Sequence, residues 1–154
     1  MIFSDGRSTF NRDIYSNFTL HILNDLIDME FILVKALHAG LKAHLNFEYR
    51  TAKTKSFQRA FQIDIDYCSV IQASKKSLSN RWFARMWKLG NYSSDCPVPP
   101  AYYYIHGWKL DGDLVPPFLA MGDYRIAGTL YYGKNLQNDS NSILKCTVNA
   151  NLVD

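Results

Sequence analysis

The chain has 154 residues, of which 47% are hydrophobic, and a net charge of +3. This length favours one domain that buries about 70% of the surface its unfolded chain would expose. The charge is too small to indicate a nucleic-acid partner without a concentrated basic patch. No run approaches the roughly 18 apolar residues that a membrane-spanning helix needs. We therefore expect a globular domain that binds no nucleic acid.

The amino-terminal part combines a polar segment with apolar strands. Residues 1–13 are polar and predict a flexible arm ahead of a single domain over residues 14–154. Alternation of apolar and polar residues over 18–22 predicts a strand, and residues 24–28 predict a turn. The apolar run over 29–37 fits either a buried strand or a capped helix, because periodicity alone does not separate them.

Two regular strands are expected next. Apolar and polar residues alternate strictly over 41–50, which indicates a strand with one buried face. This pattern also supports a strand over 29–37. Residues 57–67 predict another strand, whose apolar face is formed by Phe61, Ile63, Ile65 and Tyr67.

The period then changes from that of a strand to that of a helix. Ser77 is expected to cap a helix that stops at Gly90. Its apolar face consists of Leu78, Trp82, Phe83, Met86 and Leu89. The opposite face is basic and includes Arg81 and Arg85. A helix lying on a sheet with its cations in solvent explains this pattern, and contact with an anionic membrane or lipid headgroup is the alternative.

The last part of the chain begins with an aromatic, proline-rich stretch. Its first strand, over 102–110, is expected to place Tyr104, His106 and Trp108 on one face. Strands over 124–132 and 144–152 follow. The elements together predict an all-β protein, an immunoglobulin-like β-sandwich or β-cup of antiparallel strands with one short amphipathic helix. The aromatic residues fit a filled core and an apolar cavity equally well.

No catalytic set or metal site is evident in the sequence. Asp64 and Asp66 share a strand face, but exposed carboxylates commonly occupy such faces. His106 has no nucleophile motif to serve, and the histidines and cysteines lack the close spacing of a zinc site. We therefore expect a non-enzymatic protein without cofactor or metal.

Sequons and cysteines favour an extracellular protein, although no signal peptide is visible in this chain. Three sequons, at Asn17, Asn91 and Asn138, exceed the roughly one expected by chance and predict glycosylation. Three cysteines without a C-x-x-C pair fit one disulfide and one unpaired thiol.

Five segments carry a resemblance to a known family: FQIDIDYCSVI, the helix RWFARMWKLGN, CPVPPAYYYIHGW, LVPPF and GDYRIAGTLYYG. Over roughly residues 28–150 the chain resembles a large family of insect secreted proteins, mostly uncharacterised, some of them chemosensory. It is also similar to the ganglioside-activator and lipid-recognition (ML-type) proteins. The resemblance implies a cup-like sandwich that holds a lipid or another apolar ligand between its sheets. It also implies a disulfide between Cys68 and Cys96.

On this basis we expect a secreted carrier or presenter of an apolar ligand. The expected lining comprises Phe61, Ile63, Ile65, Tyr124, Ile126 and Leu130 from the strands, Phe118 and Leu119 at the mouth, and Trp82, Phe83 and Met86 from the helix. Arg81 or Arg85 would lie near an acidic headgroup.

Two other classes of function stay open. One is an extracellular protein–protein interaction module or receptor accessory protein, which a well-filled core would favour. The other is a hydrolase, which converging histidines and carboxylates in a polar cleft would favour. Contact with a receptor or a membrane surface is compatible with a carrier or presenter of an apolar ligand.

Overall fold

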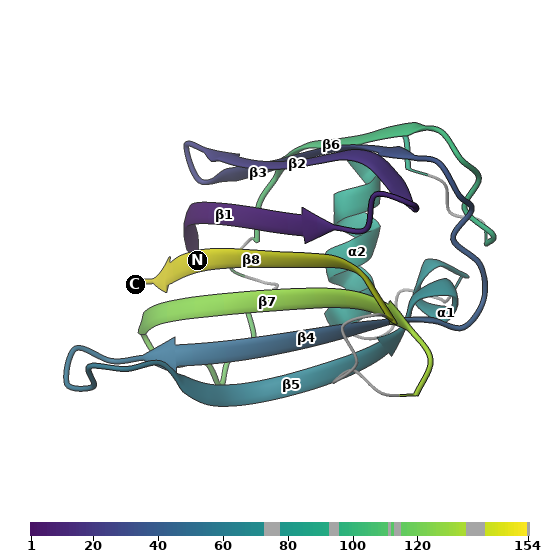
Figure 1. Ribbon diagram of the computed structural model, residues 1–154. Coiled ribbons are helices and arrows are strands. Elements are labelled where there is room, and N and C mark those ends of the chain that lie inside the picture. Colours follow the sequence, from purple (N-terminus) through teal and green to yellow (C-terminus); the bar gives the residue numbers. More distant parts are fainter. Residues whose placement is uncertain (73–77, 93–95, 111, 113–114, 135–140, 154) are drawn as a thin grey trace.

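The computed structural model describes residues 1–72, 78–92, 96–110, 112, 115–134 and 141–153. Within these residues the chain forms two antiparallel sheets that face each other, and few helices (Figure 1). The predicted all-β sandwich is therefore confirmed.

The larger sheet has five strands in the order β1-β8-β7-β4-β5. Their bounds are β1 (Ile2–Phe10), β4 (Leu41–Arg50), β5 (Gln58–Asp66), β7 (Gly122–Tyr132) and β8 (Ser142–Leu152). The smaller sheet has the order β2-β3-β6, with β2 (Tyr15–Leu23), β3 (Leu26–Leu33) and β6 (Tyr102–Trp108). The apolar run whose structure was ambiguous thus contributes to a strand, β3.

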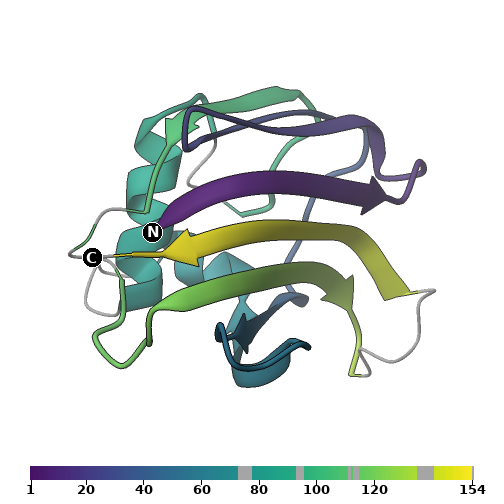
Figure 2. The ribbon, with the colours of Figure 1, turned by 90° about the vertical axis from the view of Figure 1, so that its left-hand side faces the viewer.

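Two helices connect the sheets on one side of the sandwich. They are α1 (Tyr67–Gln72) and α2 (Leu78–Lys88). In two views at right angles, α2 extends from the level of the smaller sheet to that of the larger one (Figures 1 and 2). The helix therefore forms a side wall of the space between the sheets.

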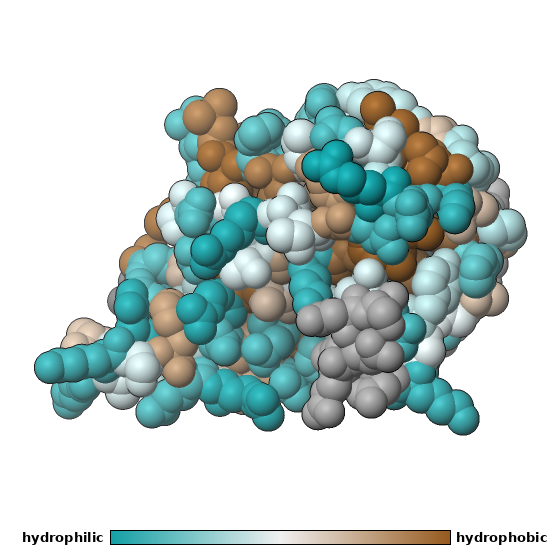
Figure 3. All heavy atoms as spheres, in the orientation of Figure 1, coloured by the Kyte–Doolittle hydropathy of each residue, from teal (hydrophilic) through white to brown (hydrophobic). Residues whose placement is uncertain are grey.

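The strict alternation of apolar and polar residues in β4 gives this strand one buried face, as predicted. Leu41, Ala43 and Phe47 are buried, whereas His44 and Glu48 take part in polar contacts on the other side of the strand. Because side chains alternate across a strand, the apolar positions of β4 lie together on its core face. In Figure 3 hydrophilic residues cover most of the surface over β4 and β5.

The predicted flexible arm over 1–13 is wrong. Ile2–Phe10 forms β1 and pairs antiparallel with β8, from Ile2 opposite Asn151 to Phe10 opposite Leu144. An edge strand needs few apolar side chains, because its backbone bonds to the neighbouring strand. Phe3 supplies the main anchor, since it is buried and its ring stacks on Trp108 at 5.7 Å.

The described residues form two helices, whereas the sequence predicted only one. The expected strand over 57–67 ends at Asp66, and α1 begins at Tyr67. The carboxylate of Asp66 accepts a hydrogen bond of 2.9 Å from the backbone N–H of Ser69, which is the bond of a helix N-cap. The same bond lowers the pKa of Asp66.

Trp108 lies on the opposite face from the one predicted. Gly107 has a positive φ of 73°, and the register between β3 and β6 shifts between Ile27 and Met29. The backbone N–H of Gly107 donates to Asp28 at 2.6 Å. A bulge of this kind rotates the strand, so Trp108 turns inward and packs on Phe3.

The turn between β2 and β3 is shorter than predicted. Asn24 and Asp25 both have positive φ, 51° and 67°, as a two-residue hairpin turn requires. Leu23 and Leu26 flank them and are exposed. Hydrophobic residues accordingly gather at the tip of this hairpin, at the upper left of Figure 3.

Candidate functional site

A cavity of about 180 Å³ lies between the two sheets beside the helices. Nearly all of its surface is apolar. The smaller sheet lines it with Tyr15, Phe18, Met29, Phe31 and Ile105. The larger sheet lines it with Ala43, Leu45, Ile65, Gly128, Thr129, Leu130, Leu144 and Cys146. Tyr67, Val70, Met86, Trp87 and Tyr92 complete it from the helices and the segment after α2.

A second apolar cavity of about 120 Å³ adjoins the first. Leu45 and Met86 line both cavities and so stand between them. Trp108 and Ile126 belong to the smaller one. Methionine has an unbranched side chain with three rotatable bonds. A change of the Met86 rotamer is therefore the simplest way to join the two spaces.

Three titratable groups that line the larger cavity, Tyr15, Tyr92 and Cys146, are held uncharged by burial. Burial raises the pKa of Tyr15, and it raises that of Tyr92 well above its ordinary value. Burial also raises the pKa of the Cys146 thiol to about 12. Cys146 has no disulfide partner. All three groups stay protonated near neutral pH, so the cavity presents neutral donors within an apolar surface.

Four of the predicted lining residues lie at these cavities. Ile65, Met86 and Leu130 line the larger one, and Ile126 lines the smaller. Sequence reasoning missed the contribution of the smaller sheet and that of Tyr92. The side chains of Trp82 and Phe83 lie outside the described part of the structure.

Other predicted lining residues pack elsewhere. The Phe61 ring stacks on Phe47 at 4.2 Å and meets the Phe118 ring at 5.5 Å, and Phe61 itself lines neither cavity. Phe118 is 70% exposed. Leu119 packs against the core, and Ile63 is half-buried without lining either cavity.

Tyr124 belongs to the hydrophobic core and lines neither apolar cavity. It is buried beside Tyr49, with 5.4 Å between the ring centroids. Its hydroxyl donates to the carbonyl oxygen of Ala120 at 2.6 Å. This bond satisfies the hydroxyl and fixes the loop that precedes β7.

The predicted headgroup residues are on the surface of α2. Arg81 and Arg85 are both exposed. Arg85 lines a surface pocket with Lys88, Lys109 and Trp108. Trp108 also lines the smaller cavity, so the basic pocket and that cavity share this residue.

The disulfide between Cys68 and Cys96 is present, with 5.7 Å between the two Cα atoms. It joins α1 to the segment that follows α2. Because Val70 on α1 lines the larger cavity, the bridge holds part of the cavity wall.

The carboxyl end of α2 is tied to β6 through its backbone. Gly90 bridges to Ile105, and the N–H of His106 donates to the carbonyl oxygen of Leu89 at 3.1 Å. A Cβ at Gly90 would overlap the carbonyl oxygen of Tyr104. Only glycine allows the two backbones to approach so closely.

The carboxamide of Asn91 extends this attachment. Its Nδ2 donates to the carbonyl oxygen of Tyr102 at 2.9 Å, and its Oδ1 accepts from the N–H of Tyr104 at 2.8 Å. A predicted glycosylation site thus has a structural role. Asn17 is exposed on β2, and Asn138 lies outside the described residues.

Histidine–carboxylate pairs occur, but on separate sheets. His44 contacts Asp64 at 2.7 Å on the larger sheet, and His106 contacts Glu30 at 3.0 Å on the smaller one. Neither pair lines a cavity described above. Asp66, which was expected to share a strand face with Asp64, caps α1. Among the described residues, no group of three or more His, Cys, Asp or Glu could hold a metal ion.

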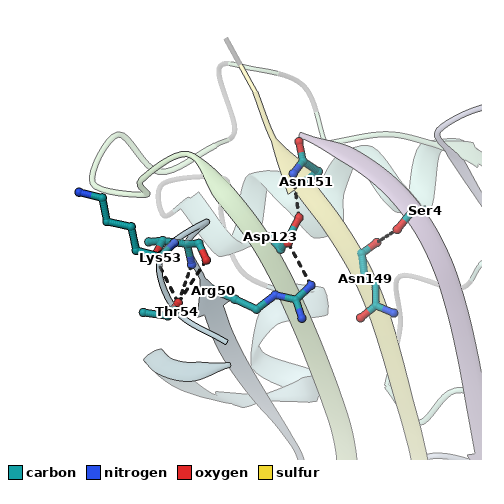
Figure 4. Close-up of polar contacts among 8 residues, drawn as sticks. Ser4, Arg50, Lys53, Thr54, Asp123, Asn149 and Asn151 are labelled. Atoms are coloured by element: carbon teal, nitrogen blue, oxygen red, sulfur yellow. Dashed lines mark hydrogen bonds and ion pairs between the residues drawn. The ribbon is translucent and has the colours of Figure 1, made fainter. Parts of the chain in front are cut away.

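A polar cluster lies across β4, β7 and β8 (Figure 4). Asp123 accepts hydrogen bonds from Asn151 at 2.9 Å and from Arg50 at 3.1 Å. These bonds, with that from Asn151 first, lower the pKa of Asp123. The carboxylate thus joins neighbouring strands, and Ser4 extends the contacts to β1 by donating to the carbonyl of Asn149 at 3.3 Å.

Fold and site together define a class: an all-β sandwich with an apolar cavity between its sheets and a disulfide-tethered helical side wall. The chain belongs to the family described as Protein of unknown function (DUF1091), which matches residues 43–126. This segment contains most of β4, all of β5 and β6, both helices, and the disulfide. No curated protein matches the sequence. No helix in the described ranges is long and apolar enough to cross a membrane.

Proposed function

We propose that this protein is a non-enzymatic binding protein that holds a small apolar molecule, or part of a lipid chain, between its two sheets. The observation that carries the proposal is the apolar cavity of about 180 Å³. For comparison, a cavity of about 150 Å³ lined by aliphatic and aromatic side chains in another protein binds benzene. The resemblance to insect secreted proteins and to lipid-recognition (ML-type) proteins supports the same proposal, with chemosensation as one setting.

The cavity wall has the properties that such binding requires. Its aliphatic and aromatic side chains gain about 0.8 kcal/mol for each ligand methylene transferred from water. Met86 lies on α2 and can adapt its shape to different ligands. Hydrophobic burial is not directional, so we expect broad chemical tolerance and sharper selection by size.

A substitution that fills the cavity tests the proposal. Ala43 is buried on β4 and lines the larger cavity, so Ala43→Leu adds three carbon atoms to the space. Displacing two ligand methylenes is expected to weaken the binding of p-xylene or 1-octanol about tenfold or more. Isothermal titration calorimetry measures the dissociation constants directly.

Ala127→Leu on β7 is the matched control. Ala127 pairs with Asn46, next to the pair of Leu45 with Gly128 that lines the cavity, and it lines neither cavity itself. This variant is expected to keep wild-type affinity within about twofold. No binding of either probe by the wild-type protein, or equal losses in both variants, would favour the protein–protein interaction module.

Secretion and glycosylation are part of the proposal. The disulfide is compatible with an oxidising compartment. Asn17 is exposed, whereas the carboxamide of Asn91 already bonds to β6. We therefore expect fuller glycan occupancy at Asn17 than at Asn91 in protein secreted from insect cells.

Glycosidase treatment followed by intact-mass and peptide mapping measures this occupancy. Asn17→Gln should remove one glycan mass without changing the folded protein. Secreted protein whose mass does not shift on treatment would remove the sequons as support for secretion.

A further inference from the structure

The hydroxyl of Tyr92 is a buried polar atom without a hydrogen-bond partner at the larger cavity. Among the described residues, three side-chain atoms share this condition: Tyr92 Oη, Trp108 Nε1 and Ser142 Oγ. Of these three residues, Tyr92 alone lines the larger cavity. Native proteins pair most buried polar atoms, so each exception calls for an explanation.

Aromatic packing fixes the position of this hydroxyl. The Tyr92 ring lies 5.8 Å from that of Phe31, 6.1 Å from that of Trp87 and 5.2 Å from that of Tyr103, measured between centroids. The neighbouring backbone is held as well, because the carboxamide of Asn91 is bonded to β6. The hydroxyl therefore cannot reach solvent through a simple rotation of the side chain.

Two buried tyrosines, Tyr103 and Tyr124, bond their hydroxyls within the protein. Tyr103 donates to the carbonyl oxygen of Pro99 at 2.6 Å, and Tyr124 donates to that of Ala120 at 2.6 Å. Tyr92 differs from both in having a cavity beside it. An acceptor atom placed in that cavity can supply the missing bond.

The electrostatics of the cavity restrict which acceptor group can supply the missing hydrogen bond to Tyr92. Tyr15, Tyr92 and Cys146 are all neutral near pH 7, because burial raises the pKa of each. Among the described residues that line the cavity, none is a lysine, an arginine or a histidine. A buried carboxylate would therefore lack a countercharge, and burial of an unpaired charge is strongly unfavourable. A neutral acceptor oxygen meets no such cost.

We propose that the Tyr92 hydroxyl donates a hydrogen bond to the single acceptor oxygen of a small neutral ligand, such as a ketone, an aldehyde or an ester with an apolar body. This assignment rests on the proposed function and narrows its ligand class. It differs from the expectation of an acidic headgroup at Arg81 or Arg85, which lie outside on α2.

Two probes of nearly the same shape isolate this hydrogen bond. Acetophenone carries a carbonyl oxygen where α-methylstyrene carries a CH₂ group, and each has one aromatic ring. Titration calorimetry gives the dissociation constant of each probe for the wild-type protein and for Tyr92→Phe, which makes four constants in all. The ratio of the two dissociation constants cancels the differing hydrophobicity of the probes when it is compared between proteins.

Tyr92→Phe is expected to weaken acetophenone binding about tenfold and to leave α-methylstyrene binding unchanged or slightly tighter. The ligand-free variant should unfold at the same temperature as the wild type or higher, since the substitution removes an unpaired hydroxyl. Tyr103→Phe is the control, because its hydroxyl bonds to Pro99 and does not line the cavity. It should shift both probes equally.

The outcomes separate this inference from the proposed function. If both probes bind and Tyr92→Phe changes them by the same factor, the hydrogen bond is refuted while cavity binding stands. A lowered unfolding temperature of ligand-free Tyr92→Phe would also refute it, because the hydroxyl would then have a partner within the protein or a bound water. If wild-type protein binds neither probe, cavity binding of such molecules fails, and this inference fails with it.

Discussion

Gly90→Ala is expected to destabilise the protein by about 3 kcal/mol or more. An added Cβ would overlap the carbonyl oxygen of Tyr104 and would lie 2.7 Å from its carbonyl carbon and 3.1 Å from the Cα of Ile105. All three atoms belong to the β6 backbone, so no side-chain rotation can relieve the overlap. The end of α2 would have to move away from β6, breaking the bridge between Gly90 and Ile105.

Equilibrium unfolding in urea measures this loss of stability. Gly112→Ala is the matched control, because a Cβ there meets no atom within 4 Å. It should unfold within about 0.5 kcal/mol of the wild type, as surface substitutions usually do. Wild-type stability for Gly90→Ala would contradict the close approach of the Gly90 backbone to the Tyr104 carbonyl.

Removal of the disulfide is expected to cost a similar amount. The bridge joins residues separated by 28 positions, and the loss of chain entropy in the unfolded state predicts about 3.5 kcal/mol for such a loop. The Cys68→Ala/Cys96→Ala double variant should therefore unfold at a much lower denaturant concentration. Because the bridge holds α1 beside the cavity, this variant should also bind apolar probes more weakly.

Cys146→Ala provides the comparison for the disulfide variant. Its thiol is unbridged, so the substitution removes one buried sulfur atom and leaves the crosslink intact. It should cost about 1 kcal/mol. Equal stability of the double variant and the wild type, or peptide mapping that finds Cys68 and Cys96 as free thiols, would contradict the prediction.

Alternation predicted the regular strands well, and local chemistry explains where it failed. Residues 41–50 formed a strand with the expected buried face, because one side of that strand meets the core along its length. The helix α1 was missed, because its cap depends on one hydrogen bond from Ser69 to Asp66. The inward turn of Trp108 was missed, because a single bulge at Gly107 reverses the alternation.

The candidate site was predictable only in part, since a cavity between sheets needs both of its walls. Alternation identified Ile65 and Leu130 on the larger sheet. The opposite wall includes Phe18 and Phe31, which belong to strands that sequence patterns located without showing which sheet they face. Tyr92 carried no periodic signal at all, because it lies in an irregular segment between α2 and β6.

The pairing of β1 with β8 has a consequence for how the protein folds. Ile2 lies opposite Asn151, so the first strand finds its partner only in the last one. The hairpins β2–β3 and β4–β5 close over short loops and can form early, whereas β1 must wait until β8 is in place. Closing such a long loop costs more chain entropy, and distant contacts of this kind slow folding. Until then Phe3 and Phe10 stay exposed on an unpaired strand, so aggregation competes with the last step of assembly.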